Sequence, residues 1–485
     1  MAARGWMDRA GFWPLAFVGY FLFQAVWRRA TGGALGLDEA QIILDGRGLA
    51  WGYGAQPPLY GWLQWAFFRL IPDPILAMAL LKNALLASTF LLVYRLLRSA
   101  HPPRVAGLAA ASMMLLPQIA WESQRALTHS VLCTTLAAAA ALVFWTRVLP
   151  RRPGAHLLFG LVVGLGMLAK ANFVFVPVAL VLAAASLPEL RRGLSPAGIA
   201  AAGAVAAAIC VGPALWALRH PDVAFASTYK LRRDPELSAV AAAGRGLLAL
   251  AGAVGGFLAL PVVVLGILRW RCGRPAAPGA APVLDRFLLR TVVVGLALVV
   301  VAVLVTGSTN TKDRWLQPVL YLAAPVATLW LLPRMREAGG RWLGRAVAAL
   351  AVLAAAALPV ALVIGTPGEV ARGGAPVAEV AAGVAERFPE PGRFVVDPEW
   401  LAGNFHYLHP EWQVERAQDV VLAPGETALL VVMDGRRTVD EVMGELAARS
   451  GRALAQGEAA VVSAPYAWRP AESLVLRVVP LEAAQ

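Results

Sequence analysis

Long apolar runs and short polar segments alternate over the first 364 residues of the chain. The runs recur at about the length of 20 residues that a helix needs to cross a bilayer. Lys170 and Asn172 divide one apolar stretch, so this stretch is assigned as two helices. We predict eleven membrane-spanning helices, at residues 11–27, 74–94, 104–121, 127–146, 156–169, 171–187, 196–218, 246–268, 287–305, 315–332 and 343–364. The fold class is therefore an α-helical polytopic membrane protein, with a transmembrane domain at residues 1–364.

The pattern changes from about Gly365 onward. Short apolar runs bounded by turn residues predict strands, at residues 392–397, 427–434, 459–463 and 473–479. The segment 438–450 begins with a capping threonine and has helical apolar spacing. We predict a small extramembrane α/β domain at residues 365–485. It contains no nucleotide-binding fingerprint, and docking of an acceptor or a contribution to stability is its simplest role.

Composition supports a membrane protein, since 59% of the 485 residues are hydrophobic and only 15% are charged. Soluble domains are closer to half apolar and a quarter charged. The net charge of +13 could indicate a nucleic-acid partner. However, the basic residues form short clusters between apolar runs, as at 147–152 and 334–341, which is the distribution of the positive-inside rule. Anionic membrane lipids are then the natural counter-charge, and we expect no nucleic acid.

The basic clusters predict the topology. They place the N-terminus in the cytoplasm and, with an odd number of spans, the C-terminal domain on the outer face of the inner membrane. The two long outer connections are residues 28–73 and 219–245. The cytoplasmic loops are short and contain no Walker-type glycine loop. Any chemistry is therefore expected on the outer face, without ATP or a nucleotide sugar.

The first outer loop, residues 28–73, has the most distinctive sequence. It contains the adjacent acids Asp38 and Glu39, then Pro57-Pro58 and a belt of aromatic residues, at Tyr60, Trp62, Trp65, Phe67 and Phe68. This loop resembles the first loop of family 39 glycosyltransferases, the protein O-mannosyltransferase and aminoarabinose-transferase group with the GT-C architecture. The resemblance implies transfer of a sugar from a polyprenyl-phosphate donor, with inversion, to a lipid, glycan or protein acceptor.

The resemblance assigns roles to the acid pair. Asp38 would be the catalytic carboxylate, acting as the base or orienting the acceptor, and Glu39 would support it. A carboxylate is a weak base, but it can serve if proton transfer is late and the transition state resembles an oxocarbenium ion. The residues alone leave an alternative open, because an aspartate before an apolar helix is also a common N-cap.

Four cations match family segments that contact the donor phosphate. Arg125 lies in WESQRALTH, Lys170 in GLGMLAKANF, and Lys312 and Arg314 in TGSTNTKDRWLQP. The resemblance implies that they hold the phosphate as the sugar leaves. Taken singly, each is better explained as a cation that extends to the membrane interface, and only the four together, at family-like positions on the predicted outer side, favour the phosphate role. The later run WLAGNFHYLHP resembles an aromatic-histidine segment in the outer domain of bacterial relatives.

The chain departs from the family where many relatives carry acidic or histidine residues. Ala55 and Gln56 precede the Pro57-Pro58 pair, and His129 replaces an aspartate. Cys133, Cys210 and Cys272 suggest neither a disulfide nor a metal site. We therefore expect no metal and no cofactor.

Two other classes of protein fit parts of the pattern. A transporter could use charged residues at a helix break such as 170–172 to line a substrate path. Transporters of that kind usually contain two similar halves, and the 36–62 segment has no second copy. A non-catalytic scaffold is the third possibility. The clustered interfacial charges favour the glycosyltransferase.

Overall fold

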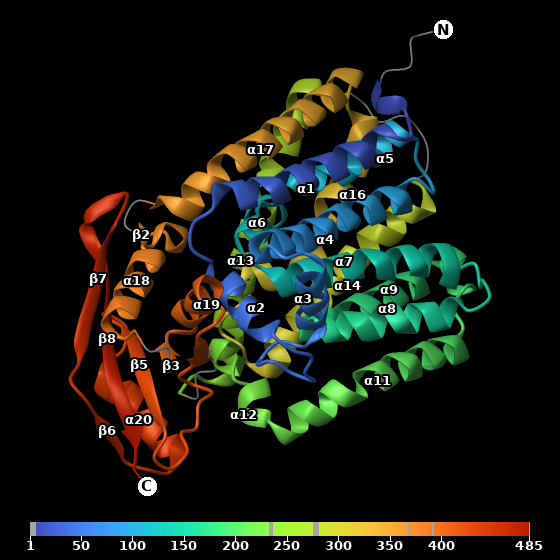
Figure 1. Cartoon of the computed structure of the whole chain (residues 1–485). Coiled ribbons are helices and arrows are strands. Elements are labelled where there is room, and N and C mark those ends of the chain that lie inside the picture. The colour runs from blue at the N-terminus through green and yellow to red at the C-terminus, as the bar shows by residue number, and fades with distance from the viewer. Residues whose placement is uncertain (1–5, 232–235, 275–280, 367–368, 390–391, 485) are drawn as a thin grey trace. The chain divides into compact units, whose positions relative to one another are not determined.

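The computed structural model of the chain describes residues 6–231, 236–274, 281–366, 369–389 and 392–484 (Figure 1). The chain forms two compact units, and each is described by itself. The first contains Met1–Val26, Ala50–Leu63 and Ala79–Ala355, and the second contains Trp27–Leu49, Gln64–Met78 and Ala356–Gln485.

Six helices within the described ranges are long and apolar enough to cross a membrane. They are α4 (Pro74–Leu97), α7 (Thr128–Val143, continued by a π-helical turn to Val148), α11 (Pro196–Arg219), α13 (Ala239–Cys272), α14 (Val283–Thr306) and α17 (Glu337–Val363). A bent pair of helices, Pro103–Leu115 and Gln118–Arg125, would make a seventh span. The chain is therefore a helical multi-pass membrane protein, as predicted.

Other predicted spans coincide with helices that are shorter or less apolar. These are α1 (Phe12–Thr31), α8 (Ala155–Ala169), α9 (Phe175–Ala185), α15 (Gln317–Leu320) and α16 (Ala323–Leu331). The predicted break is confirmed, since α8 ends at Ala169 and Lys170 has an extended backbone. The count of eleven spans stays a prediction.

The segment predicted as one straight span at 104–121 is bent. Helix α5 (Pro103–Ala111) and a 3-10 turn (Ser112–Leu115) are followed, at an angle of 76°, by a π-helical turn (Gln118–Glu122) and α6 (Ser123–Arg125). Pro117 lies at this bend, and proline lacks the N–H that would continue the helical hydrogen bonds. Arg125 is therefore the last residue of the short helix α6, which follows the bend, and it does not end one straight span.

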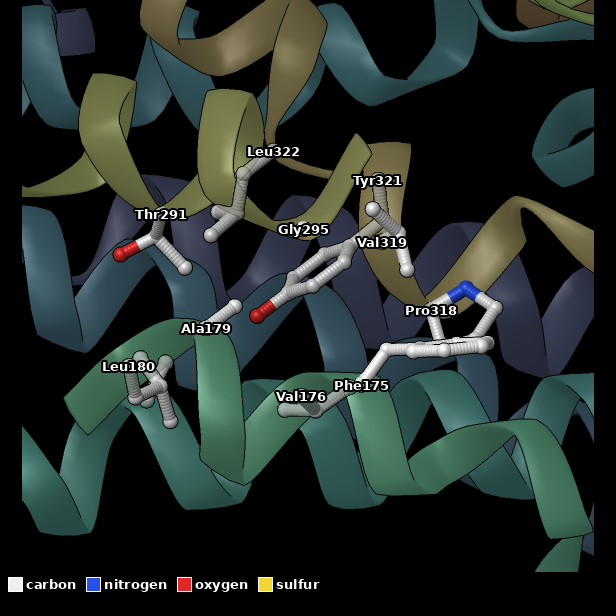
Figure 2. A pocket seen from close by; sticks show the side chains of 11 residues that line it. Phe175, Val176, Ala179, Leu180, Thr291, Gly295, Pro318, Val319, Tyr321 and Leu322 are labelled. Atoms are coloured by element: carbon white, nitrogen blue, oxygen red, sulfur yellow. The ribbon is translucent and has the colours of Figure 1, made fainter. Parts of the chain in front are cut away.

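Small residues set the packing of helices in the first unit. A Cβ atom added to Gly160 of α8 would lie 2.5 Å from the carbonyl oxygen of Ala202 in α11. Such close approach of backbones is typical of membrane helices, where packing replaces the hydrophobic driving force. A small cavity between α9, α14 and residues 318–322 is lined mainly by apolar side chains (Figure 2). Only Thr291 and Tyr321 bring hydroxyl groups to its lining, and none of the predicted site residues lines it.

The second unit contains a six-stranded mixed sheet. Its strands are β3 (Arg393–Asp397), β4 (Gln413–Arg416), β5 (Thr427–Met433), β6 (Leu454–Gln456), β7 (Ala460–Tyr466) and β8 (Arg469–Ala483). The order is β4-β3-β5-β8-β6, and β7 also pairs with β8. Strand β3 is parallel to β4 and β5, and the remaining pairs are antiparallel. A separate two-stranded ladder joins β1 (Gly365–Thr366) and β2 (Glu369–Val370).

The predicted strands correspond to β3, β5, β7 and β8, and the predicted helix is α20 (Val439–Ser450). Thr438 and Glu441 form a reciprocal capping box at its start. The sequence-based prediction missed α18 (Val377–Arg387), α19 (Glu399–Leu408), β4 and β6. Strand β8 is also longer than predicted. It pairs with β5 along one of its edges and with both β6 and β7 along the other.

Two short helices follow α1 in the chain. They are α2 (Leu37–Asp45) and α3 (Leu59–Leu70). Helix α2 belongs to the second unit and packs on α19 of the sheet domain. Residues 28–49 of the loop that the sequence singled out, which include Asp38 and Glu39, thus belong to the same compact unit as the C-terminal sheet, whereas residues 50–63 belong to the first unit.

Candidate functional site

The acid pair opens helix α2. Gly36 is the N-cap, so Asp38 and Glu39 both lie in the first turn. The alternative of Asp38 as the N-cap is therefore wrong, and Asp38 is half-buried. A carboxylate in a first helical turn is favoured by the partial positive charge of the helix N-terminus.

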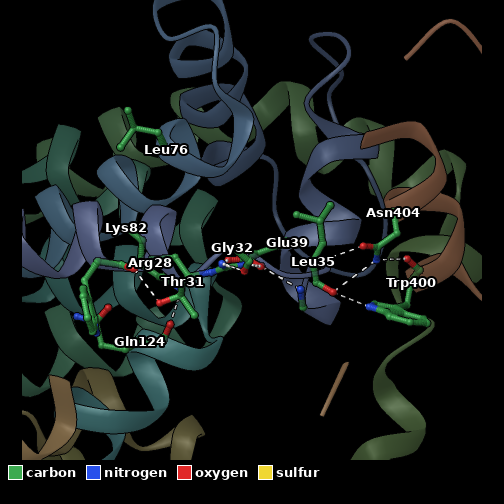
Figure 3. A network of polar contacts seen from close by, with 12 residues as sticks. Arg28, Thr31, Gly32, Leu35, Glu39, Leu76, Lys82, Gln124, Trp400 and Asn404 are labelled. Atoms are coloured by element: carbon green, nitrogen blue, oxygen red, sulfur yellow. Dashed lines mark hydrogen bonds and ion pairs between the residues drawn. The ribbon is translucent and has the colours of Figure 1, made fainter. Parts of the chain in front are cut away.

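Glu39 is held by an arginine at the end of α1. The Nε and Nη2 atoms of Arg28 donate to the two carboxylate oxygens of Glu39 at 2.9 and 2.7 Å (Figure 3). The Arg28 and Glu39 side chains are only 7% and 12% exposed. Arg28 also donates to the carbonyl of Gly32 at 2.9 Å, and the Gly36 N–H donates to Glu39 at 2.9 Å. These contacts make Glu39 the group that fixes the start of α2, next to Asp38.

Helix α19 holds the loop just before α2. The indole N–H of Trp400 donates to the carbonyl of Leu35 at 2.6 Å, and the Leu35 N–H donates to the amide oxygen of Asn404 at 2.8 Å (Figure 3). Asn404 also donates to the carbonyl of Trp400 at 2.8 Å. Both side chains are buried. Sequence reasoning gave these residues no role, although they stand in the run WLAGNFHYLHP that resembled an outer-domain segment.

The far end of α2 meets an arginine of β4. Arg416 lies 3.0 Å from Asp45 and 2.6 Å from Glu399, and it also contacts Asp419. Burial raises the pKa of Asp45 to about 7; Glu399 and Asp419 add to this effect, while Arg416 opposes it. Arg416 thus forms ion pairs with three carboxylates, and Asp45 is the most buried of the three.

The shifted carboxyl predicts a dependence of stability on pH. The pKa of Asp45 is about 7 in the folded protein, above the ordinary value near 3.8. The folded state therefore binds this proton more tightly than the unfolded chain. The resulting stabilisation is complete below pH 4 and is lost as the pH rises through 7. Thermal unfolding in detergent between pH 5 and 8 should show this loss, and Asp45→Asn should flatten it. An unchanged slope in the variant would refute the assignment.

Arg125 lies in the first unit, at the end of α6. It is exposed and forms an ion pair of 3.4 Å with Glu122, which is half-buried. Leu127, two residues later, has a φ of 70°. This left-handed conformation is costly for a leucine and ends the bent segment sharply.

Hydrogen bonds bring three of the predicted segments together within the first unit. Lys170 Nζ donates to the hydroxyl of Ser130 at 2.7 Å. Asn172 donates to the carbonyl of Trp315 at 2.6 Å, and Gln118 donates to Asp313 at 2.7 Å. Arg314 is half-buried and Lys312 is exposed. Hydrogen bonds therefore join the segments that carry Arg125, Lys170, Lys312 and Arg314.

Lys82 of α4 is a further cation that sequence reasoning missed. It is only 4% exposed, and its Nζ donates to the carbonyl of Gln124 at 2.7 Å, beside Arg125. The Gln124 side chain in turn donates to Asn83 at 2.9 Å. A buried lysine in a membrane helix is costly and commonly functional. The signal was available, since Lys82 interrupts the apolar run 74–94.

His129, which stands where many relatives carry an aspartate, lies beside an aromatic ring. The His129 ring lies 5.4 Å from that of Tyr60, which is buried. Over the described parts of the chain, no group of three or more histidine, cysteine or acidic side chains is arranged to hold a metal ion. Trp62 of the aromatic belt contacts Trp51, with 5.9 Å between the ring centroids.

Comparison with known proteins identifies relatives of this chain. Residues 55–216 match the family model described as "Dolichyl-phosphate-mannose-protein mannosyltransferase". The lipopolysaccharide core galacturonosyltransferase RgtA of Rhizobium johnstonii is 31% identical over 480 residues, which cover 93% of each chain. RgtB of the same organism, with the same described activity, is 32% identical over 339 residues, covering 69% of this chain and 68% of its own.

The fold also has solved counterparts. ArnT from Cupriavidus metallidurans bound to undecaprenyl phosphate superposes with a TM-score of 0.61 and 15% identity, covering 98% of both chains. Its apo structure gives a TM-score of 0.58 and 14% identity, covering 97% of this chain and 98% of its own. At these identities the likeness establishes a shared fold, including the C-terminal domain.

Proposed function

The chain belongs to the family of membrane glycosyltransferases that includes the lipopolysaccharide core galacturonosyltransferases, and from that premise we propose that it transfers galacturonic acid to the lipopolysaccharide core. The donor in this proposal is galacturonic acid linked to a polyprenyl phosphate. Undecaprenyl phosphate is the proposed carrier, because the ArnT counterpart binds this lipid. The observation that carries the proposal is the match to RgtA over 93% of both chains.

In the proposed reaction, an acceptor hydroxyl attacks the anomeric carbon opposite the leaving phosphate. A new glycosidic bond forms with inversion, the bond to the phosphate oxygen breaks, and the polyprenyl phosphate departs. Asp38 takes the acceptor proton or orients the hydroxyl. Lys82, Arg125, Lys170, Lys312 and Arg314 are proposed to stabilise the negative charge of the phosphate. Glu39 acts through its contact with Arg28 and not through proton transfer.

The experiment is a transfer assay with purified protein and labelled donors. The panel contains four polyprenyl-phosphate sugars: galacturonic acid, galactose, which is the neutral sugar of the same configuration, aminoarabinose and mannose. The acceptor is lipopolysaccharide that lacks terminal galacturonic acid. We expect label from galacturonic acid alone to reach the lipopolysaccharide. Label from another sugar would replace the proposed substrate, and no label from any donor would refute the proposal.

The phosphate role predicts graded effects of charge removal. Arg125→Ala and Arg314→Ala should each weaken donor use by roughly 10-fold or more, since a hydrogen bond to a charged group contributes about 1.5–3 kcal/mol. Arg152→Ala is the matched control, because this exposed arginine lies in a predicted cytoplasmic loop. Apparent kcat/KM against donor concentration measures the effect. Equal behaviour of the three variants would show that the phosphate contacts are elsewhere.

The orientation in the membrane is also a proposal, with the N-terminus in the cytoplasm of the inner membrane and the sheet domain outside. Single-cysteine reporters at the exposed positions 49 and 229, and at any exposed position beyond 400, should react with a membrane-impermeant thiol reagent in intact spheroplasts. A reporter at position 152 should react only after lysis. Protection of any of the first three positions would contradict this orientation.

A further inference from the structure

The C-terminal sheet domain has a face that is directed at the loop carrying Asp38. Four residues of α19 recur at helical spacing, Trp400, Gly403, Asn404 and Tyr407. Residues three, four and seven positions apart lie on one face of a helix. All four interact with residues 28–45, so this face packs against the segment around α2, and Asp73 also acts on Tyr407.

The contact between α19 and α2 is close. A Cβ atom added to Gly403 would lie 2.3 Å from the carbonyl oxygen and 2.6 Å from the Cα of Ala40. Only glycine allows the two backbones to approach in this way. Near the end of the same face, burial raises the pKa of Tyr407, and the charges of Arg28 and Glu39 also act on its phenol. The face therefore extends from Leu35 to the ion pair that fixes Glu39.

The opposite end of α2 has its own attachment. Asp45 is the last residue of α2 and lies 3.0 Å from Arg416. The same arginine lies 2.6 Å from Glu399, the first residue of α19. Nearby, Arg47 donates to the carbonyl of Val414 in β4 at 3.0 Å. Helix α2 is thus attached to the sheet domain before its first turn, in its middle and at its end.

We propose that the sheet domain is a positioning device for Asp38, in which α19 and Arg416 fix the place of α2 as a rigid body. This inference rests on the proposed role of Asp38. Isolated helices shorter than about 12 residues are marginal in water, so the nine residues of α2 need such support. A base must also lie within hydrogen-bond reach of the acceptor, and an error of about 1 Å can reduce the rate about 10²-fold. In this account Gly403 and Arg416 are positioning residues and touch no substrate.

Two glycine variants test the inference. Gly403→Ala should separate α19 from α2, while Gly444→Ala makes the same exchange in α20, where an added Cβ meets no atom within 4 Å. Purified full-length variants are compared in the donor assay at matched expression. We expect kcat to fall roughly 10- to 100-fold for Gly403→Ala with little change in donor KM, because the loss is in alignment and not in donor contacts. Gly444→Ala should have wild-type kcat.

A second pair keeps the test decisive if Gly403→Ala does not fold. Arg416→Gln removes the link to Asp45, whereas Arg393→Gln removes an arginine that joins Glu415 and Glu426 within the same sheet. We expect a lower kcat for Arg416→Gln alone, with similar melting temperatures for the two variants. Equal kcat values across both pairs would overturn the inference. The role of Asp38 fails separately, if Asp38→Asn keeps its activity, and the proposed function fails if the wild-type protein transfers no labelled sugar.

Discussion

Replacement of Asp38 by asparagine should reduce sugar transfer by a factor of about 10² or more while the protein still folds and inserts. The exchange keeps the size and most of the hydrogen bonding of the side chain but removes its charge and basicity. Because Gly36 is the N-cap of α2, loss of a cap cannot account for the effect. Folding should change little, since Asp38 lies in the first turn and is half-buried.

Asp440→Asn is the matched control. Asp440 occupies the same position of α20 that Asp38 occupies in α2, two residues after the N-cap. Both exchanges remove the same interaction with the helix dipole, which contributes about 0.3–1 kcal/mol. The measurement compares turnover at saturating donor and acceptor together with the melting temperature. Near-normal turnover of Asp38→Asn would remove the proposed base.

Glu39→Gln should produce the largest loss of stability. The exchange leaves the Arg28 guanidinium buried without its bidentate carboxylate, and breaking one partner of a buried ion pair costs about 3–5 kcal/mol. The sequence predicted that replacing Glu39 would reduce sugar transfer less than replacing Asp38. For the chemical step we keep this prediction. The two variants should therefore differ in kind, with Asp38→Asn losing turnover and Glu39→Gln losing thermal stability.

Glu189→Gln provides the comparison for an exposed ion pair, since Glu189 and Arg286 are 2.9 Å apart at the surface. Exposed pairs contribute at most about 1 kcal/mol, so its melting temperature should hardly change. The double variant Arg28→Met, Glu39→Leu should recover much of the stability, because apolar residues can replace a buried pair. A melting temperature of Glu39→Gln equal to that of Glu189→Gln would contradict the structural role of the pair.

The sequence predicted features that depend on local patterns. Apolar length located the helices, and the capping residues around Thr438 located α20. The break at Lys170 was also predictable, because a cation and an amide there interrupt an apolar stretch. In each case the signal lies within the segment that forms the element.

Features that depend on distant contacts were missed. The attachment of Leu35 to Asn404, 369 residues away, follows from tertiary packing. The bend at Pro117 has a local signal in the proline itself, which the prediction of a span at 104–121 did not use. Helix α19 is short, and its histidine, asparagine and glycine weaken a helical pattern. The role of Glu39 required knowledge of Arg28, which the sequence pattern shows only as the basic end of a span. Lys82 was visible as a charge in an apolar run, but its importance follows from its burial.

The chemical step itself is tested most directly by a donor with two labels. Polyprenyl-phosphate galacturonic acid carrying ¹⁴C in the sugar and ³²P in the phosphate is incorporated with purified protein into liposomes, and lipopolysaccharide acceptor is added. We expect ¹⁴C to move to the acceptor while ³²P stays with the polyprenyl lipid, because the bond between the anomeric carbon and the phosphate oxygen breaks. Joint transfer of both labels, or movement of intact donor across the bilayer without ¹⁴C in the acceptor, would contradict it.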